Sequence, residues 1–321
     1  MRLLVTGGAG FIGSNFVRRI VDGSLKGVTK IVVLDKLTYA GSLSNLSDLP
    51  KDSFQFIQGD ICDESLVSRL VKQVDSIINF AAESHVDRSI TDPGRFIETN
   101  VKGTQNLLHA LKGLDDKRFV QISTDEVYGS LETGSWDENF PLLPNSPYSA
   151  SKASADLITR SYFRTFGLNV NITRSSNNYG RNQFPEKVIP LFITNLIEGK
   201  KVPLYGAGKN VRDWLHVDDN CNGIHKVLMN GRPGEIYNIG GGEELTNLVL
   251  TKAILKSFNK GDENIDYVED RLGHDFRYSV DCGKIVRELG YKPEKKFETG
   301  LKETVDWYVN NESWWRPLKK S

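Results

Sequence analysis

The sequence predicts an α/β fold in which a doubly wound parallel sheet is followed by a smaller mixed α/β unit. Short β-branched runs alternate with helical patterns over the first half of the chain, and such alternation is typical of a parallel sheet covered by helices on both faces. A glycine-rich turn follows the first of these runs. After about Arg174 the pattern changes to helical segments joined by short strands and Gly/Pro turns, which predicts the smaller unit.

The elements follow one another in a regular order. Predicted strands cover residues 3–5, 31–34, 54–57, 76–80, 119–122 and 170–173. Between and after them, helical patterns cover residues 11–21, 93–111 and 148–166, and Pro93 suits the first turn of its helix. In the second half, helical patterns cover residues 185–198, 217–229, 245–258 and 302–308. We expect the C-terminal Trp314-Trp315 pair to pack in the core or at an interface, and we assign it no chemistry.

Composition excludes several classes of function. The 321 residues include 41 Lys+Arg and 41 Asp+Glu, so the net charge is zero and there is no basic field for nucleic acid or for a membrane surface. Cys62, Cys221 and Cys282 are far apart, so we expect no disulfide framework and no metal site. No stretch has the apolar length of a signal peptide or a membrane span. We therefore expect a cytoplasmic protein.

The glycine-rich turn predicts a dinucleotide site of the Rossmann type. Thr6 to Gly13, with glycines at 7, 8, 10 and 13, follows the first strand and opens the first helix. Glycines let the backbone approach a pyrophosphate, whose charge is favoured at a helix N-terminus. Asp35 ends the second strand, where a carboxylate can bind the adenosine ribose and would repel a ribose phosphate. The pattern therefore favours NAD over NADP, and Asp60, after the next strand, is a candidate for the adenine amino group.

A tyrosine and a lysine four residues apart predict alcohol chemistry. Tyr148 and Lys152 share one face of the helix predicted there. We expect the lysine ammonium to stabilise the phenolate and lower its pKa from about 10, so that Tyr148 acts as a general base towards a sugar hydroxyl. This spacing is common on surface helices, and it gains its meaning here from the glycine turn upstream.

Two neighbouring carboxylates add a function that a simple dehydrogenase does not need. Asp125 and Glu126 directly follow Thr124 at the end of a predicted strand, on the side of the sheet where ligands bind. Thr124 can bond the oxygen that Tyr148 deprotonates. Removing water from a sugar needs a base for a C–H and an acid for the leaving hydroxyl, and two carboxylates in different environments can divide these roles.

Taken together, these segments resemble the dTDP-glucose 4,6-dehydratases of the extended short-chain dehydrogenase/reductase superfamily. The resemblance covers essentially the whole chain, and its most specific part is the Thr124-Asp125-Glu126 triplet. It rests on residues 6–13, 81–90, 123–129, 146–152, 177–180, 184–187, 212–214 and 237–241. It implies that residues 1–176 form the NAD-binding unit, to which later segments return, and that residues 177–321 mainly bind a nucleotide sugar.

The resemblance also implies a mechanism in three steps. Tyr148, paired with Lys152, takes the C4 hydroxyl proton of the hexose while hydride passes from C4 to NAD. Glu126 then removes the C5 proton, and Asp125 protonates the leaving C6 hydroxyl. Hydride returns to C6, so NAD stays tightly bound and is regenerated in each turnover. The product is a 4-keto-6-deoxy sugar nucleotide, and Thr124 polarises the C4 oxygen.

The remaining site residues are implied by the resemblance as two sets. The cofactor set is Gly7, Gly10, Phe11, Ile12, Gly13, Asp35, Lys36, Leu37, Thr38, Asp60, Ile61, Phe80, Ala81, Ala82, Ser84, Thr99, Tyr148, Lys152 and Asn178. The substrate set is Ser84, Thr124, Asn177, Lys187, Val188, Pro203, Leu204, Tyr205, Arg212, Asn247, Arg271 and His274. Arg212, Arg271 and Lys187 can neutralise a diphosphate, and residues 203–205 would flank the base.

Two departures from the family pattern leave the base open. Arg181 follows Gly180 where the family has proline, and Leu272 stands where the family has proline before Gly-His-Asp. Uridine or guanosine substrates therefore remain alternatives to thymidine. A nucleotide-sugar 4-epimerase shares the glycine turn, Tyr148 and Lys152 but has no need of the two acids. A non-catalytic NAD-binding regulator would predict a missing tyrosine or lysine.

The superfamily resemblance further implies a homodimer. Members pair the helices that correspond here to 93–111 and 148–166 into a four-helix bundle. Both helices carry apolar residues at helical spacing, and these residues serve equally well as core within one subunit.

Overall fold

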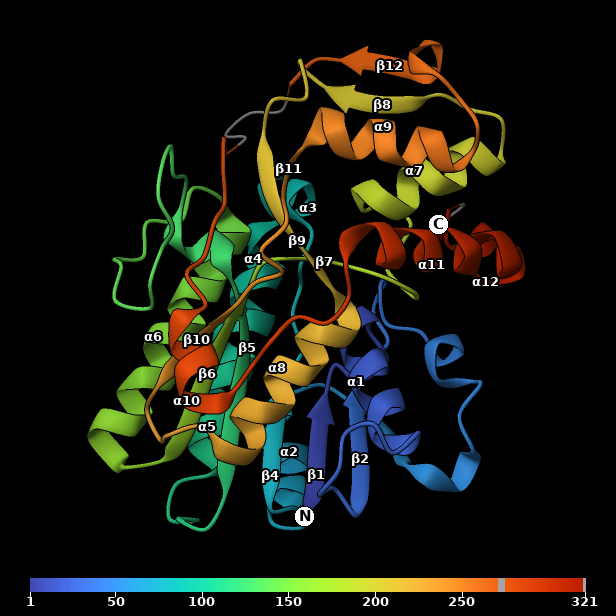
Figure 1. The fold of residues 1–321 in the computed structure, drawn as a ribbon. Helices are drawn as coiled ribbons and strands as arrows, with labels where there is room; N and C mark the ends of the chain where they lie inside the picture. Colours follow the sequence, from blue (N-terminus) through green and yellow to red (C-terminus); the bar gives the residue numbers. More distant parts are fainter. Residues whose placement is uncertain (271–274, 320–321) are drawn as a thin grey trace.

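A parallel sheet forms the larger part of the molecule. The computed structural model describes residues 1–270 and 275–319 (Figure 1). Within these residues a seven-stranded sheet has the order β10-β6-β5-β4-β1-β2-β3, and each neighbouring pair is parallel. The strands are β1 (Arg2–Thr6), β2 (Lys30–Asp35), β3 (Gln55–Gln58), β4 (Ser76–Asn79), β5 (Arg118–Thr124), β6 (Asn169–Ser175) and β10 (Ile236–Ile239). The predicted fold class is confirmed.

The strand order reverses between β1 and β4, because the chain builds outward from β1 to β3 on one side and from β4 to β10 on the other. Ligands of open α/β sheets bind at such a switch point, beyond the carboxyl ends of the strands. The segments that follow β1 and β4, at Gly7 and Phe80, are therefore placed side by side where a ligand is expected.

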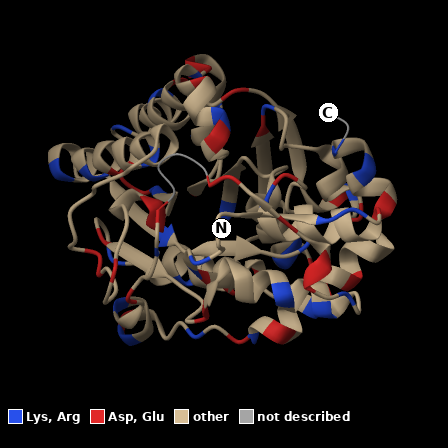
Figure 2. Cartoon of the chain, turned by 90° about the horizontal axis from the view of Figure 1, so that it is seen from above, with Lys and Arg blue, Asp and Glu red and all other residues tan. Residues whose placement is uncertain are grey.

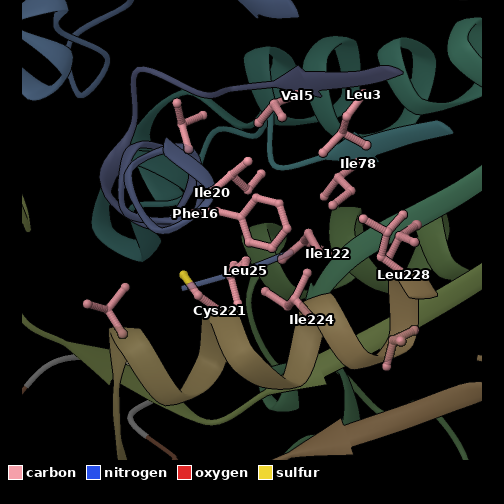
Figure 3. Packing of buried hydrophobic residues seen from close by; sticks show 14 of the residues in the cluster. Leu3, Val5, Phe16, Ile20, Leu25, Ile78, Ile122, Cys221, Ile224 and Leu228 are labelled. Carbon is pink, nitrogen blue, oxygen red and sulfur yellow. The ribbon is translucent and has the colours of Figure 1, made fainter. Parts of the chain in front are cut away.

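Helices cover both faces of this sheet. On one face lie α1 (Phe11–Val21), α8 (Val217–Asn230) and α10 (Gly283–Leu289), and on the other lie α2 (Glu64–Val71), α5 (Thr104–Ala110) and α6 (Pro147–Phe166). Figure 3 shows the first layer, where Phe16 and Ile20 of α1 meet Ile224 of α8 above Leu3 and Ile78 of the sheet. A second buried cluster joins α2, α5 and α6 to the other face. Burial on both faces fixes the strands and hence the ends that carry the site.

Segments late in the sequence contribute to the sheet. β10 pairs with β6 from Ile236 opposite Ile172 to Ile239 opposite Ser175. Helix α8 packs beside α1, and α10 packs beside α8. The chain thus leaves the sheet after β6 and returns to it twice.

The smaller unit lies beyond the carboxyl ends of the large sheet (Figure 1). Its strands form one sheet in the order β11-β9-β7 and a parallel pair of β12 with β8. These strands are β7 (Asn177–Tyr179), β8 (Val202–Tyr205), β9 (Val211–His216), β11 (Glu244–Thr246) and β12 (Ile265–Val268). The helices are α7 (Val188–Ile197), α9 (Asn247–Ser257), α11 (Phe297–Asn310) and α12 (Glu312–Leu318). Trp315 is fully buried in this unit, as a packing role predicts.

Several element boundaries differ from the predicted ones. The predicted helix 93–111 is divided into α4 (Pro93–Phe96), a π-helical segment (Ile97–Gly103) and α5. The π segment occurs where the side chain of Asn100 leaves the helix to bond the backbone of Glu83 and the hydroxyl of Ser151. Helix α7 begins only after Lys187, which is extended. Helix α11 is longer than predicted, and α2, α3 (Val86–Thr91), α10 and α12 were not predicted.

Lys and Arg are interspersed with Asp and Glu around the molecule (Figure 2). Among the residues that the structure describes, no helix combines the length and the apolar character needed to cross a membrane.

Candidate active site

A cleft opens at the switch point of the large sheet. It gathers residues from the ends of five strands and from the segment that leads into α7. Its lining includes Gly7, Gly10, Phe11, Ile12, Gly13, Asp35, Lys36, Thr38, Asp60, Ile61, Phe80, Ala81, Ala82, Ser84, Thr99, Tyr148, Lys152 and Lys187. Most of the cofactor set predicted from the sequence therefore lies in one cavity.

The glycine turn has the shape that a bound pyrophosphate requires. Gly7 has φ +68°, and a Cβ there would lie 2.5 Å from the backbone nitrogen of Ala81. A Cβ on Gly13 would collide with the carbonyl oxygen of Gly7. Only glycine fits these positions, so the turn packs closely against the segment after β4 and leads directly into the N-terminus of α1, where an anion is favoured.

Asp35 shapes the adenosine end of the cleft. Its Oδ2 accepts a hydrogen bond from the Ala9 N–H at 2.9 Å, and its Oδ1 accepts one from the Leu37 N–H at 2.8 Å. Each oxygen keeps an acceptor position for a ribose hydroxyl. Burial raises the pKa of Asp35, against the two backbone hydrogen bonds. Leu37 itself does not line the cleft, but its backbone N–H holds the Asp35 carboxylate in place. These features fit NAD.

Helix α6 carries Tyr148 and Lys152 into the cleft. The Ser146 hydroxyl caps the helix by accepting from the Ser149 N–H at 3.0 Å, and Pro147 occupies the first turn. Both site residues are buried. The Lys152 ammonium donates to the carbonyl oxygen of Ile122 at 2.5 Å. Burial lowers the pKa of Lys152 to about 8, although Asp156 opposes this shift.

The net pKa of Tyr148 is not lowered, as Lys152 alone would predict, because burial and the two neighbouring acids dominate. The pKa of Tyr148 is raised well above its ordinary value, first by burial and then by the charges of Glu126 and Asp125. Its contact with the Thr124 hydroxyl acts in the opposite direction. The lysine directs its ammonium at a backbone carbonyl instead of the phenol, so burial and the two acids decide the outcome.

The acid pair lies on η4 (Asp125–Tyr128), a single 3₁₀ turn at the end of β5. Thr124 begins this turn, because its hydroxyl accepts from the Glu126 N–H at 3.3 Å. The same hydroxyl donates to Asp125 Oδ1 at 3.1 Å. Asp125 is only 2% exposed. Glu126 is half-buried, and its Oε2 accepts from the hydroxyl of Ser149 on α6 at 3.2 Å.

The two carboxylates occupy different environments. Burial raises the pKa of Asp125 well above its usual range, and the charges of Glu126 and Asp213 add to this effect. A carboxyl group with a raised pKa keeps its proton to higher pH and is suited to act as an acid. Glu126 is more accessible, and its carboxylate accepts a hydrogen bond from Ser149.

On the substrate side, Lys187 and Ser84 lie together, with the lysine ammonium donating to the Ser84 carbonyl oxygen at 3.0 Å. Arg212 of β9 is buried over the ring of Tyr278, 4.1 Å from its centroid. Its guanidinium donates to the carbonyl oxygens of Val211, Asp275 and Phe276.

The other predicted substrate residues are spread over the smaller unit. Asn177 lies on β7, Val188 and Asn247 begin α7 and α9, and Pro203, Leu204 and Tyr205 lie on β8. None of this group lines the described cofactor cleft. Arg271 and His274 lie outside the described residues.

Comparison with known proteins identifies the family. The model of the GDP-mannose 4,6-dehydratase family matches residues 4–304. The chain belongs to this family of nucleotide-sugar dehydratases. A dTDP-glucose 4,6-dehydratase of Streptomyces antibioticus is 57% identical over 100% of this chain and 96% of that protein. The resemblance predicted from the sequence is confirmed.

Solved structures of relatives agree in fold. A dTDP-glucose 4,6-dehydratase from Streptomyces venezuelae, crystallised with NAD, has a TM-score of 0.97 and 55% identity and covers 99% of this chain and 100% of its own. A UDP-glucuronic acid 4-epimerase from Bacillus cereus has a TM-score of 0.90 but only 28% identity, over 97% of this chain and 99% of its own. The dehydratase fold is thus shared with epimerases, and the side chains must separate the two activities.

Sequence reasoning missed part of the dehydratase cleft. Further lining residues are Leu34, Tyr39, Ala40, Gly41, Gly59, Glu83, Ile122, Ser123, Gln183, Phe184 and Glu186. Leu34 and Ile122 already lie in predicted strands, and Gly59 and Ser123 could have been found by extending the predicted strands by one or two residues. Gln183, Phe184 and Glu186 come from the segment that leads into α7. Residues 184–187 belong to the family resemblance, but only Lys187 was predicted as a site residue. Asn178, which was predicted, does not line the cleft, and its amide donates to the Ser176 carbonyl oxygen at 2.9 Å.

Proposed function

We propose that the protein is an NAD-dependent dTDP-glucose 4,6-dehydratase, which converts dTDP-glucose to dTDP-4-keto-6-deoxyglucose and water. The observation that carries this proposal is the buried Asp125 and half-buried Glu126 beside Thr124 and Tyr148. An epimerase needs only the alcohol chemistry of Tyr148 and Lys152. The full-length similarity to a dTDP-glucose 4,6-dehydratase supports the same reading.

In the first step, Tyr148 accepts the proton of the C4 hydroxyl while Thr124 orients the oxygen. NAD⁺, held by the glycine turn and Asp35, would supply the hydride acceptor for C4 and the hydride for C6, and its positive charge would favour the phenolate. Lys152, which is anchored to the carbonyl oxygen of Ile122, keeps a positive charge near the phenol below about pH 8.

In the second step, the C4 ketone acidifies the C5–H bond. Glu126 removes this proton, and Asp125 gives its proton to the C6 hydroxyl as it leaves as water. The raised pKa of Asp125, caused first by its burial, suits an acid, because the group still holds its proton at the start of the step. The double bond between C5 and C6 then takes up a hydride at C6 and a proton at C5.

The direct experiment is an assay of the purified protein against dTDP-, UDP- and GDP-hexoses, with the product followed by mass spectrometry. We expect dTDP-glucose to lose the mass of one water and the UDP and GDP sugars to react much more slowly. Conversion with unchanged mass would indicate an epimerase and contradict the proposal. Faster turnover of a UDP or GDP sugar would contradict the choice of thymidine.

We also propose a homodimer that forms through α3, the π segment and α6. These elements pack together and expose Ile90 at 53%, Ile97 at 54% and Leu157 at 56%. Burial of such side chains in a dimer would remove them from water. Ile97→Glu together with Leu157→Glu should convert a dimer to a monomer in light scattering, whereas a wild-type protein that is already monomeric would contradict the proposal.

A cytoplasmic location completes the proposal. Cys62, Cys221 and Cys282 are free thiols, which suits a reducing compartment. Cell fractionation should place the protein with soluble cytoplasmic enzymes, and recovery from a membrane or an external fraction would contradict this.

A further inference from the structure

A buried arginine touches both elements that carry the catalytic pairs. Arg174 lies on β6 opposite Ser123 of β5, and its side chain is 3% exposed. Its Nε donates to Asp156 Oδ2 on α6 at 2.9 Å, and its Nη1 donates to the phenol oxygen of Tyr128 on η4 at 2.8 Å. We call Arg174, Asp156 and Tyr128 the Arg174 bracket.

The first arm of the bracket, the Arg174–Asp156 ion pair, holds α6. Asp156 lies one helical turn after Lys152, so the two side chains share a face of α6. The Asp156 side chain is 1% exposed, and its ion pair with Arg174 is buried. A buried pair of this kind resists separation, because removing one partner leaves an uncompensated charge. The arm therefore ties the helix that carries Tyr148 and Lys152 to β6.

The second arm, the hydrogen bond from Arg174 to Tyr128, holds η4. Tyr128 follows Asp125 by three residues, and side chains three apart eclipse one another on a 3₁₀ turn. Both are 2% exposed. The Tyr128 phenol accepts from Arg174 and donates to Asn238 Oδ1 at 2.8 Å, and its ring stacks on Trp136 with centroids 5.3 Å apart. The position of this ring therefore sets the rotation of the single turn that carries both acids.

We propose that Tyr128 and Arg174 are positioning residues that aim Asp125 and Glu126 at the hexose oxidised by Tyr148. This inference rests on the proposed function. It separates the two steps, because oxidation uses the glycine turn, α6 and Thr124 at the end of β5, whereas elimination also needs the acids of η4 in a fixed place relative to α6. A loosened Tyr128 arm should thus slow elimination and spare oxidation.

The Tyr128→Phe variant tests this arm alone. It keeps the stacked ring and the Arg174–Asp156 pair and removes only the hydroxyl. In single-turnover experiments with dTDP-glucose, we expect NADH to form at close to the wild-type rate. Its decay and the release of product should slow by about tenfold to a hundredfold, the range expected for a small misplacement of reacting groups. Bound NADH, seen by its absorbance, should therefore accumulate during turnover.

A matched control is Tyr162→Phe, in the later turns of α6. This buried phenol accepts from Gln105 Nε2 at 3.2 Å and is far along the helix from Tyr148. We expect wild-type rates of NADH formation and decay in this control.

Arg174→Lys is the second test, since lysine keeps the charge but lacks the planar guanidinium that can bond two partners at once. Because it loosens both arms, it should slow the formation of NADH as well as its decay. Thermal unfolding and bound NAD are measured for every variant.

Three results would overturn the inference. Tyr128→Phe could slow NADH formation and decay equally, it could behave like wild type, or Tyr162→Phe could accumulate NADH to the same extent. Wild-type protein that does not dehydrate dTDP-glucose would overturn the proposed function as well. Wild-type dehydration with any of the first three results would overturn the positioning role alone.

Discussion

The two residue pairs proposed to act in catalysis are carried by elements of very different size. Tyr148 and Lys152 lie on α6, a helix of 20 residues that is capped by Ser146 and packed against β5, β6 and the π segment. Asp125 and Glu126 lie on η4, a turn of 4 residues. A long packed helix holds its side chains through many contacts, whereas a single turn depends on a few neighbours. Oxidation should therefore tolerate local changes that elimination does not.

The largest expected effect is that of Tyr148→Phe, because loss of the base on the long helix removes both steps. We expect NADH and product to form about 10²- to 10⁴-fold more slowly when dTDP-glucose is added. Absorbance and mass spectrometry check this, with bound NAD and thermal unfolding as controls for folding. Reduction of bound NAD at close to the wild-type rate would show that another group accepts the C4 proton.

Asp125→Asn combined with Glu126→Gln should impair only the elimination step, which depends on the two acids of η4. Substrate should still reduce bound NAD, because Tyr148 and Lys152 are intact. Product formation should fall by about 10²- to 10⁴-fold. Rapid-mixing absorbance and product mass measure the two parts separately. Unchanged product formation would refute the roles assigned to both acids.

The pH dependence should differ between the two steps. Burial, first, and then the charges of Glu126 and Asp213 raise the pKa of Asp125, so the group is protonated and active as an acid below this pKa. The decay of NADH should slow as pH rises through it, by about tenfold for each pH unit beyond it. In Asp125→Asn the decay should be slower throughout and lack this alkaline decline. If Asp125→Asn kept the alkaline decline in the rate of NADH decay, a group other than Asp125 would be responsible for it.

The smallest effect is expected from Ser149→Ala, which removes the bond between α6 and Glu126. A hydrogen bond to a charged group contributes about 1.5 kcal/mol or more, so we expect a reduction of roughly tenfold in the decay of NADH and little change in its formation. Ser154→Ala is the control, because its hydroxyl lies on the exposed side of α6 and bonds Ala150. Equal effects of the two variants would remove Ser149 from the account.

The sequence predicted the large sheet well because its signals are local. Each strand is a short β-branched run, and Gly7, Gly13 and Asp35 follow at fixed distances from the first two strands. Tyr148 and Lys152 are four residues apart, so they share one face as soon as the segment is helical. These residues are indeed gathered in the cleft.

Other features could not be predicted, because they depend on contacts between distant segments. Gln183 and Phe184 reach the cleft only because the smaller unit folds back over the sheet, where the Phe184 ring meets Tyr39 with centroids 5.4 Å apart. The raised pKa of Tyr148 comes from burial that no spacing reveals. Arg174 and Asp156 are 18 residues apart in the sequence, and nothing local marks them as partners.

The central claim is that one hexose is oxidised by the residues of α6 and dehydrated by those of η4 within a single visit to the cleft. The most direct test is the reaction of dTDP-glucose that carries deuterium at C4. The account predicts a product that has lost one water and carries the deuterium at C6. A product of unchanged mass, or one whose deuterium has remained at C4 or gone to the solvent, would contradict it.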